Sequence, residues 1–210
     1  MNRKTAEHLD LSIHTKTRKN LPRELAISGL FAALIAAGAF IQVTIPVQPY
    51  PMHVTMQWFF VLLAGLLLEP KLAAGSVGTY LLIGLCGVPV FASGGGPAYL
   101  LRPTFGFLLG FLAAAWGMAV CCKQMRFSAA GRIVPALLGL FVYYAVGVLY
   151  FYMISNYVIA MPVGWKVVLV NCCLLTVGAD FLLCLLAAAA AGRMRPAVAA
   201  LMENACPSGR

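Results

Sequence analysis

The chain alternates between long apolar stretches and short breaks that contain Pro, Gly or charged residues. The first stretch, Leu25–Ile45, has about 21 residues and no charged side chain. An α-helix of about 20 apolar residues spans the hydrocarbon core of a bilayer, so this stretch can cross a membrane. Of all residues, 62% are hydrophobic and 10% are charged, whereas about a quarter of the residues in a soluble domain are charged. The chain therefore has too little polar surface to form a water-soluble globule.

Further apolar stretches divide the rest of the chain, which gives about six predicted helices. After the first, they are Val54–Leu68, Leu72–Cys86, Thr104–Cys122, Ile133–Ile154 and Gly164–Gly192. The second and third helices are short for a membrane span, so we expect protein to shield them or flanking turns to extend them. The last stretch is either one tilted helix or an interfacial segment, Trp165–Cys173, followed by a helix from about Gly178. We favour the second alternative, because Gly178 and Asp180 are typical of a helix start.

The distribution of basic residues predicts how the helices are oriented. Six of the 15 Lys and Arg residues precede the first apolar stretch: Arg3, Lys4, Lys16, Arg18, Lys19 and Arg23. If the N-terminus is inside, the inner connections add Lys71, Lys123, Arg126, Arg132, Arg193 and Arg195, and the outer connections hold only Arg102 and Lys166. Cytoplasmic loops carry the excess of Lys and Arg in membrane proteins. We therefore predict that both termini are cytoplasmic.

These observations predict an all-α, multi-pass protein of the cell (inner or plasma) membrane with about six transmembrane helices. The expected organisation is a cytoplasmic basic tail (1–23), a six-helix membrane domain (24–195) and a cytoplasmic C-terminal tail (196–210). The net charge of +9 does not indicate a nucleic-acid partner, because the basic residues gather in the N-terminal arm. There they would face the anionic leaflet of the lipid bilayer.

The sequence contains no recognisable catalytic or metal-binding arrangement. Its seven Cys residues include the adjacent pairs Cys121–Cys122 and Cys172–Cys173, whereas zinc sites separate their Cys ligands by two to four residues. Its three His residues lie in the N-terminal arm or in a loop, and no glycine-rich nucleotide-binding motif is present. We therefore expect neither an enzyme nor a bound metal or cofactor.

Asp180 is the one acidic residue within a predicted membrane helix. A carboxylate in hydrocarbon costs a few kcal/mol, so it should face protein, a cavity or a partner. Two interpretations stay open from the residues alone. Asp180 is either an acid at a helix start that faces the outer water or a carboxylate that contacts a ligand.

The predicted outer loop at 87–103 offers several groups that suit ligand binding. Gly95 and Gly96 permit backbone conformations and close approaches that other residues do not. Phe91 and Tyr99 provide aromatic faces, and Arg102 provides a guanidinium group for an acidic or carbonyl oxygen. A long loop of this composition in a compact membrane protein indicates a function rather than a simple connection.

A second outer loop, at 46–57, adds the hydroxyl group of Thr55 and the amide group of Gln57. Thr55 also suits an N-cap, which is the alternative structural interpretation. Because both loops share one side of the membrane with Asp180, we expect them to converge on an outward-facing pocket.

The first predicted helix carries small residues at four-residue spacing: Ala32, Ala33, Ala36 and Ala37. Such a stripe permits another helix to approach closely. We interpret it as a candidate surface for docking a partner subunit.

Together these segments resemble the BioY family, the biotin-specific S components of energy-coupling factor (ECF) transporters. The similarity begins with LFAALIAAGAFIQVTIPV and continues through residues 51–111, where VTMQWFFVLLAGLLL, GVPVFASGGG and RPTFGFLLGF are the most specific segments. Gly178-Ala179-Asp180 is similar to a Gly-Asp pair of the family. The chain departs from the family at Leu183, where a Lys is often found, and at Phe105 and Phe107, where Gly and Tyr are more usual.

The resemblance implies biotin uptake, with this chain as the high-affinity, biotin-binding membrane subunit of an ECF-type ABC transporter. It implies that Asp180 accepts hydrogen bonds from the ureido N–H groups of biotin and that Arg102 donates to its oxygens. Phe91 and Tyr99 would contact the bicyclic ring, and the small residues of the first helix would dock the transmembrane T component, with ATPase subunits driving transport. Two alternatives stay open: an S component for another vitamin or small metabolite, and a solitary biotin transporter, alone or as a homo-oligomer.

Overall fold

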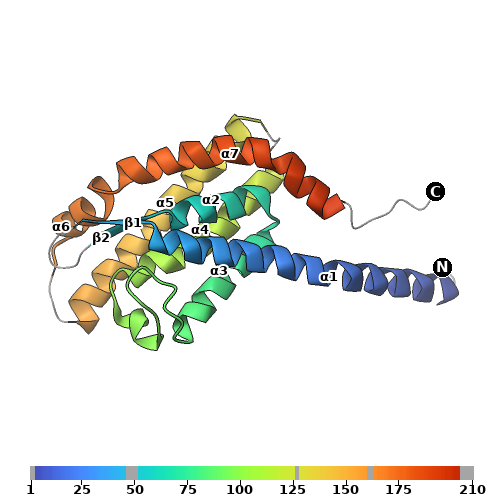
Figure 1. The fold of residues 1–210 in the computed structure, drawn as a ribbon, viewed down its shortest axis with the longest axis horizontal. Coiled ribbons are helices and arrows are strands. Elements are labelled where there is room, and N and C mark those ends of the chain that lie inside the picture. Colours follow the sequence, from blue (N-terminus) through green and yellow to red (C-terminus); the bar gives the residue numbers. More distant parts are fainter. Residues whose placement is uncertain (1–2, 46–51, 126–127, 160–162, 204–210) are drawn as a thin grey trace.

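The structure, a computed structural model, describes residues 3–45, 52–125, 128–159 and 163–203. These residues form a bundle of helices with a short β-hairpin at one end (Figure 1). In chain order the elements are α1 (Arg3–Phe40), β1 (Gln42–Ile45), β2 (Met52–Thr55), α2 (Gln57–Leu67), α3 (Pro70–Leu85), the 3-10 helix η1 (Pro97–Leu101), α4 (Phe105–Gln124), α5 (Ala130–Met153), the π-helical turn η2 (Ile154–Val158), α6 (Trp165–Leu169), the π-helical turn η3 (Val170–Leu174) and α7 (Val177–Glu203). The start of α1 and the end of α7 lie at the end of the bundle opposite the hairpin and α6 (Figure 1).

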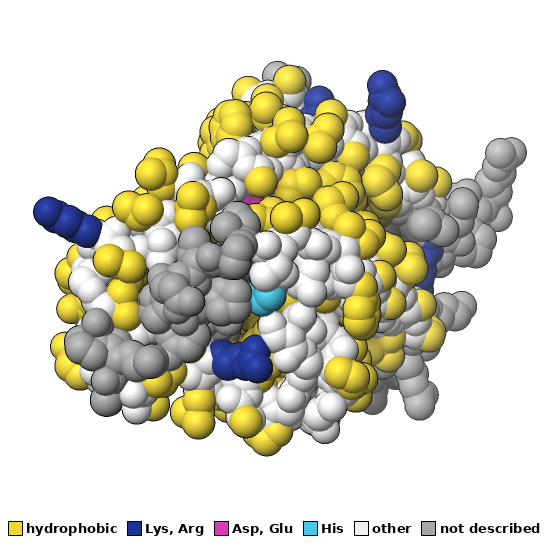
Figure 2. Space-filling model, turned by 60° about the vertical axis from the view of Figure 1, so that its left-hand side comes forward, with side chains coloured by type: hydrophobic (Ala, Val, Ile, Leu, Met, Phe, Trp, Pro, Cys, Tyr) yellow, Lys and Arg dark blue, Asp and Glu magenta, His cyan; other side chains and the backbone are white. Residues whose placement is uncertain are grey.

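The exterior of the bundle is suited to lipid. In the part of the chain that the structure describes, four helical stretches are long and apolar enough to cross a membrane: Pro22–Phe40, Phe105–Gln124, Ala130–Val158 and Trp165–Val198. Large apolar side chains such as Phe141, Trp116 and Leu182 point outward and are more than half exposed. Apolar side chains are spread over the face drawn in Figure 2, where the basic side chains stand apart from one another. A soluble surface rarely exposes this much apolar area.

Helix α2 lies inside the bundle, with α1, α3, α4, α5 and α7 packed around it. With 11 residues it is too short to span a bilayer by itself. The run Val61–Leu66 is buried, and so are Gln57 and Trp58 at the start of the helix. Neighbouring helices rather than lipid therefore cover α2, as the sequence predicted for a short apolar helix.

Helices α4 and α5 approach each other closely through glycine. A Cβ atom at Gly110 would lie 2.8 Å from the backbone oxygen of Tyr143, and one at Gly147 would collide with the ring of Phe107. Because no side chain separates the two backbones here, α4 and α5 pack closely, and Phe107 lies against Tyr143.

The hairpin corrects the all-α prediction and the limits of the first two predicted helices. The predicted helix Leu25–Ile45 ends at Phe40, and the predicted helix Val54–Leu68 begins at Gln57. Strands β1 and β2 pair antiparallel, with Gln42 opposite Thr55. The β-branched run Val43-Thr44-Ile45 favours a strand over a helix, which is the local reason for the difference. The connecting residues 46–51 lie outside the described residues.

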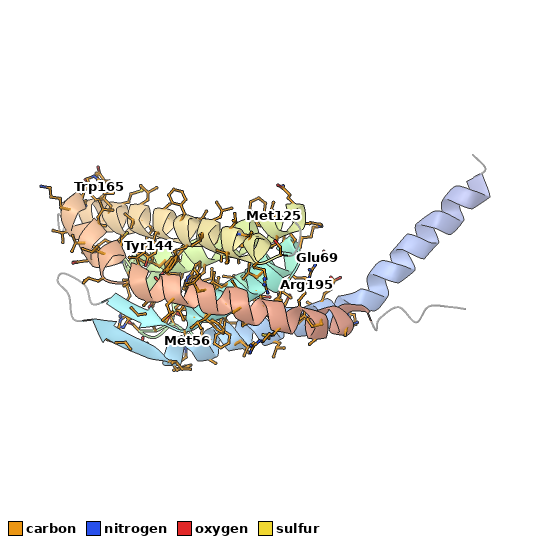
Figure 3. The ribbon with its side chains drawn as sticks, turned by 90° about the horizontal axis from the view of Figure 1, so that it is seen from above. Met56, Glu69, Met125, Tyr144, Trp165 and Arg195 are labelled. Carbon is orange, nitrogen blue, oxygen red and sulfur yellow. The ribbon has the colours of Figure 1, made fainter. Side chains whose placement is uncertain are left out.

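The remaining helices agree with the prediction more closely. Helices α3, α4 and α5 begin and end within three residues of their predicted limits. The last stretch is divided near the predicted position, because α6 and η3 end before a turn at 175–176 and α7 begins at Val177. Helix α7 continues to Glu203, so it extends past the predicted end at Gly192 and includes residues 196–203 of the predicted C-terminal tail. At the N-terminus, residues 3–23 of the predicted tail are helical and continuous with α1. That part of α1 projects beyond the bundle (Figure 3).

Candidate functional site

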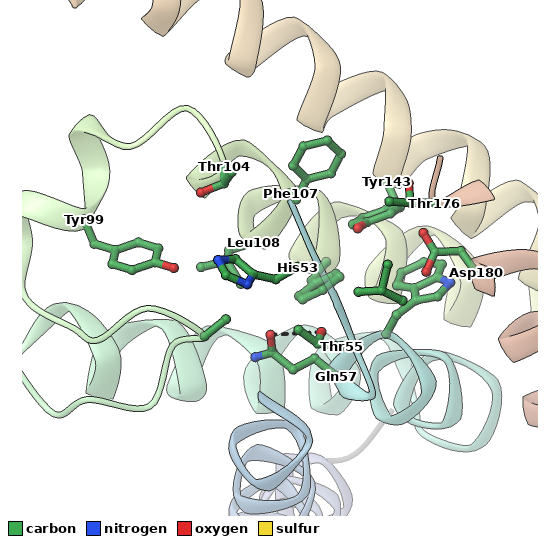
Figure 4. A pocket seen from close by; sticks show the side chains of 14 residues that line it. His53, Thr55, Gln57, Tyr99, Thr104, Phe107, Leu108, Tyr143, Thr176 and Asp180 are labelled. Carbon is green, nitrogen blue, oxygen red and sulfur yellow. Dashed lines mark hydrogen bonds between the residues drawn. The ribbon is translucent and has the colours of Figure 1, made fainter. Parts of the chain in front are cut away.

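A pocket lies between the hairpin, the loop around η1 and helices α2, α4, α5 and α7. It is lined by His53, Val54, Thr55, Gln57, Trp58, Ala92, Tyr99, Thr104, Phe107, Leu108, Phe111, Tyr143, Thr176 and Asp180. The free space between these side chains, including the mouth open to solvent, is about 620 Å³. Tyr99 lies at one end of the pocket and Asp180 at the other, with His53 between them (Figure 4).

Asp180 forms the acidic end of the pocket, in the first turn of α7. Its side chain is buried, with 4% of its surface exposed, so it does not simply face the outer water. The Tyr144 hydroxyl group donates a hydrogen bond to Asp180 Oδ2 at 2.5 Å. Thr176 Oγ1 lies 2.8 Å from the same hydroxyl oxygen and 2.7 Å from the Cys172 carbonyl oxygen, and its single proton is shared between these two acceptors. Within the described residues Asp180 forms no salt bridge, and the Tyr144 hydroxyl group is the side-chain donor to its carboxylate.

Aromatic rings from three helices form a wall of the pocket. Trp58 of α2 stacks on Tyr143 of α5 and on Phe111 of α4, with centroid distances of 4.6 and 5.7 Å. Phe111 and Tyr143 are also stacked, at 5.3 Å, and Phe107 is tilted against Tyr143 at 5.3 Å. Such a wall suits an apolar, compact ligand body.

His53 links the hairpin to the glycine-containing loop beside the pocket. Its Nδ1 atom lies 3.0 Å from Thr44 Oγ1, and its Nε2 atom lies 3.1 Å from Ser93 Oγ. Gln42 Nε2 adds a second link by donating to the Ala92 carbonyl oxygen at 3.2 Å. Burial, and secondly the charge of Arg102, lower the pKa of His53 below its usual value of 6.5. The neutral imidazole is therefore the form that joins the two loops at neutral pH. The surface drawn in Figure 2 is hollowed around a histidine side chain.

The glycines at 94–96 shape the loop but do not line the pocket. Gly94 and Gly96 have φ angles of 114° and 100°, which side-chain-bearing residues rarely adopt. The Gly96 N–H group donates to the Gly84 carbonyl oxygen at 2.8 Å, and Gly95 lies against the backbone of Val88. The loop is thereby held on the end of α3.

The predicted ligand-binding residues fall into two groups. Asp180, Tyr99, Thr55 and Gln57 are brought together at the pocket. The other four, Phe91, Arg102, Gly95 and Gly96, lie behind it or beside it.

Several contacts explain this division. Phe91 is buried beneath the pocket-lining Tyr99, with 4.7 Å between the ring centroids. Arg102 is exposed, and its Cζ atom lies 5.1 Å from the centroid of the Tyr99 ring. Gln57 Nε2 donates to the Tyr80 hydroxyl group, and Thr55 Oγ1 donates to Gln57 Oε1 at 3.3 Å. Thr55 therefore orients the next polar side chain rather than capping α2, whose N-cap residue is Met56.

The sequence did not single out His53 as a pocket residue, nor the aromatic wall or Thr176. One signal was present, because Phe107 and Phe111 are four residues apart and so share one face of a helix. The Tyr143-Tyr144 pair within an apolar stretch was another. Neither signal reveals which neighbouring helix these rings meet.

The four alanines of the predicted docking stripe lie on different sides of α1. Ala32 is buried and Ala36 packs against the core, whereas Ala33 and Ala37 are exposed. Only the second pair is open to another subunit.

Within residues 3–45, 52–125, 128–159 and 163–203, no three His, Cys, Asp or Glu residues are grouped in a way that could hold a metal ion. The six Cys residues in these ranges are free thiols.

Comparison with known proteins places the sequence motifs in a family. The sequence profile of the BioY family matches residues 6–200. A probable biotin transporter BioY of Lysinibacillus sphaericus is 37% identical over 171 residues, which cover 81% of this chain and 85% of that protein. The biotin transporter BioY of Thermotoga maritima is 40% identical over 127 residues, or 60% of this chain and 72% of the relative.

The fold agrees with this similarity. The crystal structure of the S-component for biotin from an ECF-type ABC transporter matches with a TM-score of 0.71, covering 84% of this chain and 93% of that one. The two chains are 23% identical, so this match shows a common fold. The motifs, the family profile and the relatives all agree with the resemblance predicted from the sequence, and the chain belongs to the BioY family.

Proposed function

We propose that this protein is the biotin-binding membrane subunit of a biotin uptake system, and not an enzyme. The observation that carries the proposal is the buried carboxylate of Asp180 at the end of an aromatic-walled pocket. Biotin has an apolar bicyclic body with two ureido N–H donors, and such donors require an acceptor when they leave water. Membership of the BioY family and the names of its relatives support biotin as the ligand.

The shape of the pocket supports one orientation of the ligand. The ureido ring would lie at the Asp180 end, and the bicyclic body would lie against the stacked rings of Trp58 and Tyr143. The carboxylate tail of biotin would then extend toward Tyr99, beside which Arg102 provides a positive charge. Arg102 would act at the mouth of the pocket rather than deep inside it.

The proposed membrane arrangement has six helices, α1–α5 and α7, with both termini in the cytoplasm. The start of α1 and the end of α7 lie at one end of the bundle, as an even number of crossings requires (Figure 1). Glu69 and Arg195 lie toward that end, and Trp165 lies at the other (Figure 3). The excess of basic residues favours the first end as the cytoplasmic one, so the hairpin and the pocket would face outward.

The exposed residues Ala33 and Ala37 are the proposed docking surface for an ECF T component, whose ATPase subunits would drive transport. The second candidate function is an S component for another small vitamin. Leu183 supports this second candidate. It is an apolar residue packed against the core, at a position where the BioY family often has a Lys, so the chain differs from the usual family pattern there. Titration with biotin and with other vitamins separates the two candidates.

The test is calorimetric titration of biotin into the purified protein and its Asp180→Asn variant. We expect the variant to bind biotin at least tenfold more weakly, because the amide has one acceptor oxygen and adds donors that face those of the ligand. A hydrogen bond to a charged group contributes about 1.5–3 kcal/mol, and about 1.4 kcal/mol corresponds to tenfold in affinity.

Glu69→Gln is the matched control, since Glu69 is an exposed acid outside the pocket. It should leave biotin affinity unchanged, and size-exclusion profiles should show that each variant is folded. Unchanged affinity in Asp180→Asn would remove Asp180 from the site. A wild-type protein that binds another vitamin in preference to biotin would support the second candidate.

A further inference from the structure

Tyr144 approaches Asp180 from α5, 36 positions earlier in the sequence. Its ring is held edge-on between Phe107, at a centroid distance of 6.3 Å, and Tyr143, at 4.9 Å. Tyr144 is not among the residues that line the pocket. Its hydroxyl group therefore reaches the carboxylate from the protein side, and not from the side that a ligand would occupy.

The contact involves one oxygen atom of the carboxylate. The Tyr144 hydroxyl donates to Oδ2 at 2.5 Å, and the described residues place no side-chain donor on Oδ1. The terminal torsion of an Asp side chain has a broad, roughly two-fold energy profile, so the carboxylate can rotate unless a contact holds it. A hydrogen bond to Oδ2 removes this freedom and sets the direction of Oδ1.

The hydroxyl group of Tyr144 is itself held by a second contact. Thr176 Oγ1 lies 2.8 Å from it, and Thr176 is buried in the turn before α7. The single hydroxyl proton of Thr176 is shared between the Tyr144 oxygen and the Cys172 carbonyl oxygen, which lies 2.7 Å away in the π-helical turn η3. Isolated π-helical turns are frequent at functional sites, where they leave a backbone carbonyl group free for another donor. The side chains of α5 and α7 and the backbone of η3 thus form one connected set of contacts.

In the described part of the chain, no positively charged side chain takes part in this set of contacts around Asp180. Among the residues that the structure describes, no Lys, Arg or His forms an ion pair with Asp180. A buried carboxylate needs donors, and a tyrosine hydroxyl supplies one without a positive charge that would compete with a ligand. The acceptor strength of Oδ1 is then available to neutral N–H donors.

We propose that Tyr144 is a positioning residue for ligand binding, which fixes Asp180 through Oδ2 so that Oδ1 meets the N–H donors of the ligand. The inference rests on the proposed function, because it takes biotin as the ligand. Thr176 supports the same arrangement by holding the Tyr144 hydroxyl group.

A double-mutant cycle, measured by calorimetric titration of biotin, tests this role. Tyr144→Phe keeps the ring and its packing but removes the donor, and we expect biotin affinity to fall about tenfold. In the Asp180→Asn background, the same substitution should change affinity less than twofold, because Tyr144 acts through the carboxylate. A purely structural role would lower affinity equally in both backgrounds.

Two further variants complete the experiment. Tyr150→Phe is the matched control, because Tyr150 is also on α5 and donates to a backbone carbonyl, that of Leu100, at 2.6 Å. It should change affinity less than twofold. Thr176→Val should weaken binding about threefold, and it replaces Tyr144→Phe in the cycle if that variant does not elute as a folded protein.

Equal losses in the two backgrounds, or a Tyr150→Phe loss as large as that of Tyr144→Phe, would overturn the assignment. Unchanged affinity in Tyr144→Phe would also overturn the assignment, but it would not contradict the proposed function of biotin binding. Failure of the wild-type protein to bind biotin would instead contradict the proposed function, and the inference with it.

Discussion

Several polar side chains of the bundle are paired with groups from other elements. Gln57 of α2 donates to the Tyr80 hydroxyl group of α3, which in turn donates to the Val90 carbonyl oxygen at 3.3 Å. The amide group of Asn156 bonds both the N–H group and the carbonyl group of Val163. Such pairing is required where water cannot reach, because a buried polar group left without a partner costs about 1–3 kcal/mol. These residues therefore hold loops and helix ends in place around the pocket.

His53 should make the stability of the protein depend on pH. Its pKa is lowered in the folded protein, so the unfolded chain binds more protons between the folded value and the usual 6.5. This contribution to stability is complete above pH 6.5 and is lost as the pH falls through the folded value. His53→Gln keeps hydrogen-bonding groups but cannot become charged. We expect the variant to lose less thermal stability than the wild type between pH 7.5 and 5.

Thermal unfolding of the two proteins in the same detergent measures this difference. The two other histidines, His8 and His14, are present in both proteins and cancel in the comparison. Parallel curves for the wild type and His53→Gln would show that His53 is not the titrating group.

At the scale of elements, α1 presents two different faces. Ala32 and Ile35 enter the core, and Gly38 lies so close to the start of α2 that a Cβ atom there would lie 2.9 Å from the Gln57 backbone nitrogen. Ala33 and Ala37 lie on the outer face, where a helix of another subunit could approach closely. The same helix therefore closes the bundle on one side and offers a surface for assembly on the other.

We expect Ala33→Leu to reduce energised biotin uptake at least fivefold while changing the affinity of the purified protein less than twofold. The larger side chain would hold a partner helix away, but it lies outside the pocket. Uptake of labelled biotin by vesicles that contain the T component and ATPase subunits measures the first effect, and calorimetry measures the second.

Ala145→Leu is the matched control, because Ala145 is an exposed alanine on α5. It should affect neither measurement. A loss of affinity in Ala33→Leu as large as its loss of uptake would argue against a docking role for this face.

For the whole molecule, the two ends of the bundle have different roles. One end carries the start of α1 and the end of α7, and the other carries the hairpin and α6 (Figure 1). His53, which links the hairpin to the neighbouring loop, also lines the pocket, so the pocket opens at the hairpin end. In the proposed orientation, a ligand enters from outside the cell and is bound beneath two loops.

Labelling of single cysteines in a Cys-free background tests this orientation. Ala98→Cys, in η1, should react with a membrane-impermeant maleimide in intact cells. Ala129→Cys, just before α5, should react only after the membrane is permeabilised. Both alanines are exposed, so accessibility across the membrane decides the result. Labelling of Ala129→Cys but not of Ala98→Cys in intact cells would show that the protein has the opposite orientation in the membrane.

The sequence by itself determined the features that depend on local composition. Apolar stretches and the Pro, Gly and charged breaks between them predicted the limits of α3, α4 and α5 and the start of α7 within three residues, because hydropathy acts along the chain. The same reading identified the family and singled out Asp180, since a carboxylate in an apolar stretch needs a special environment. The sequence analysis missed the hairpin, because β1 and β2 are stabilised by pairing with each other and this pairing is not visible in either segment alone.

Only the tertiary structure decided which residues meet. Helices that are apolar on all sides have no strong periodic pattern, so their rotation cannot be read from the sequence. Ala32 and Ala33 are adjacent, yet one is buried and the other is exposed. The Tyr144 contact with Asp180 and the stacking of Trp58 on Tyr143 join different helices. Such contacts depend on how the helices rotate and pack together, which no local pattern specifies.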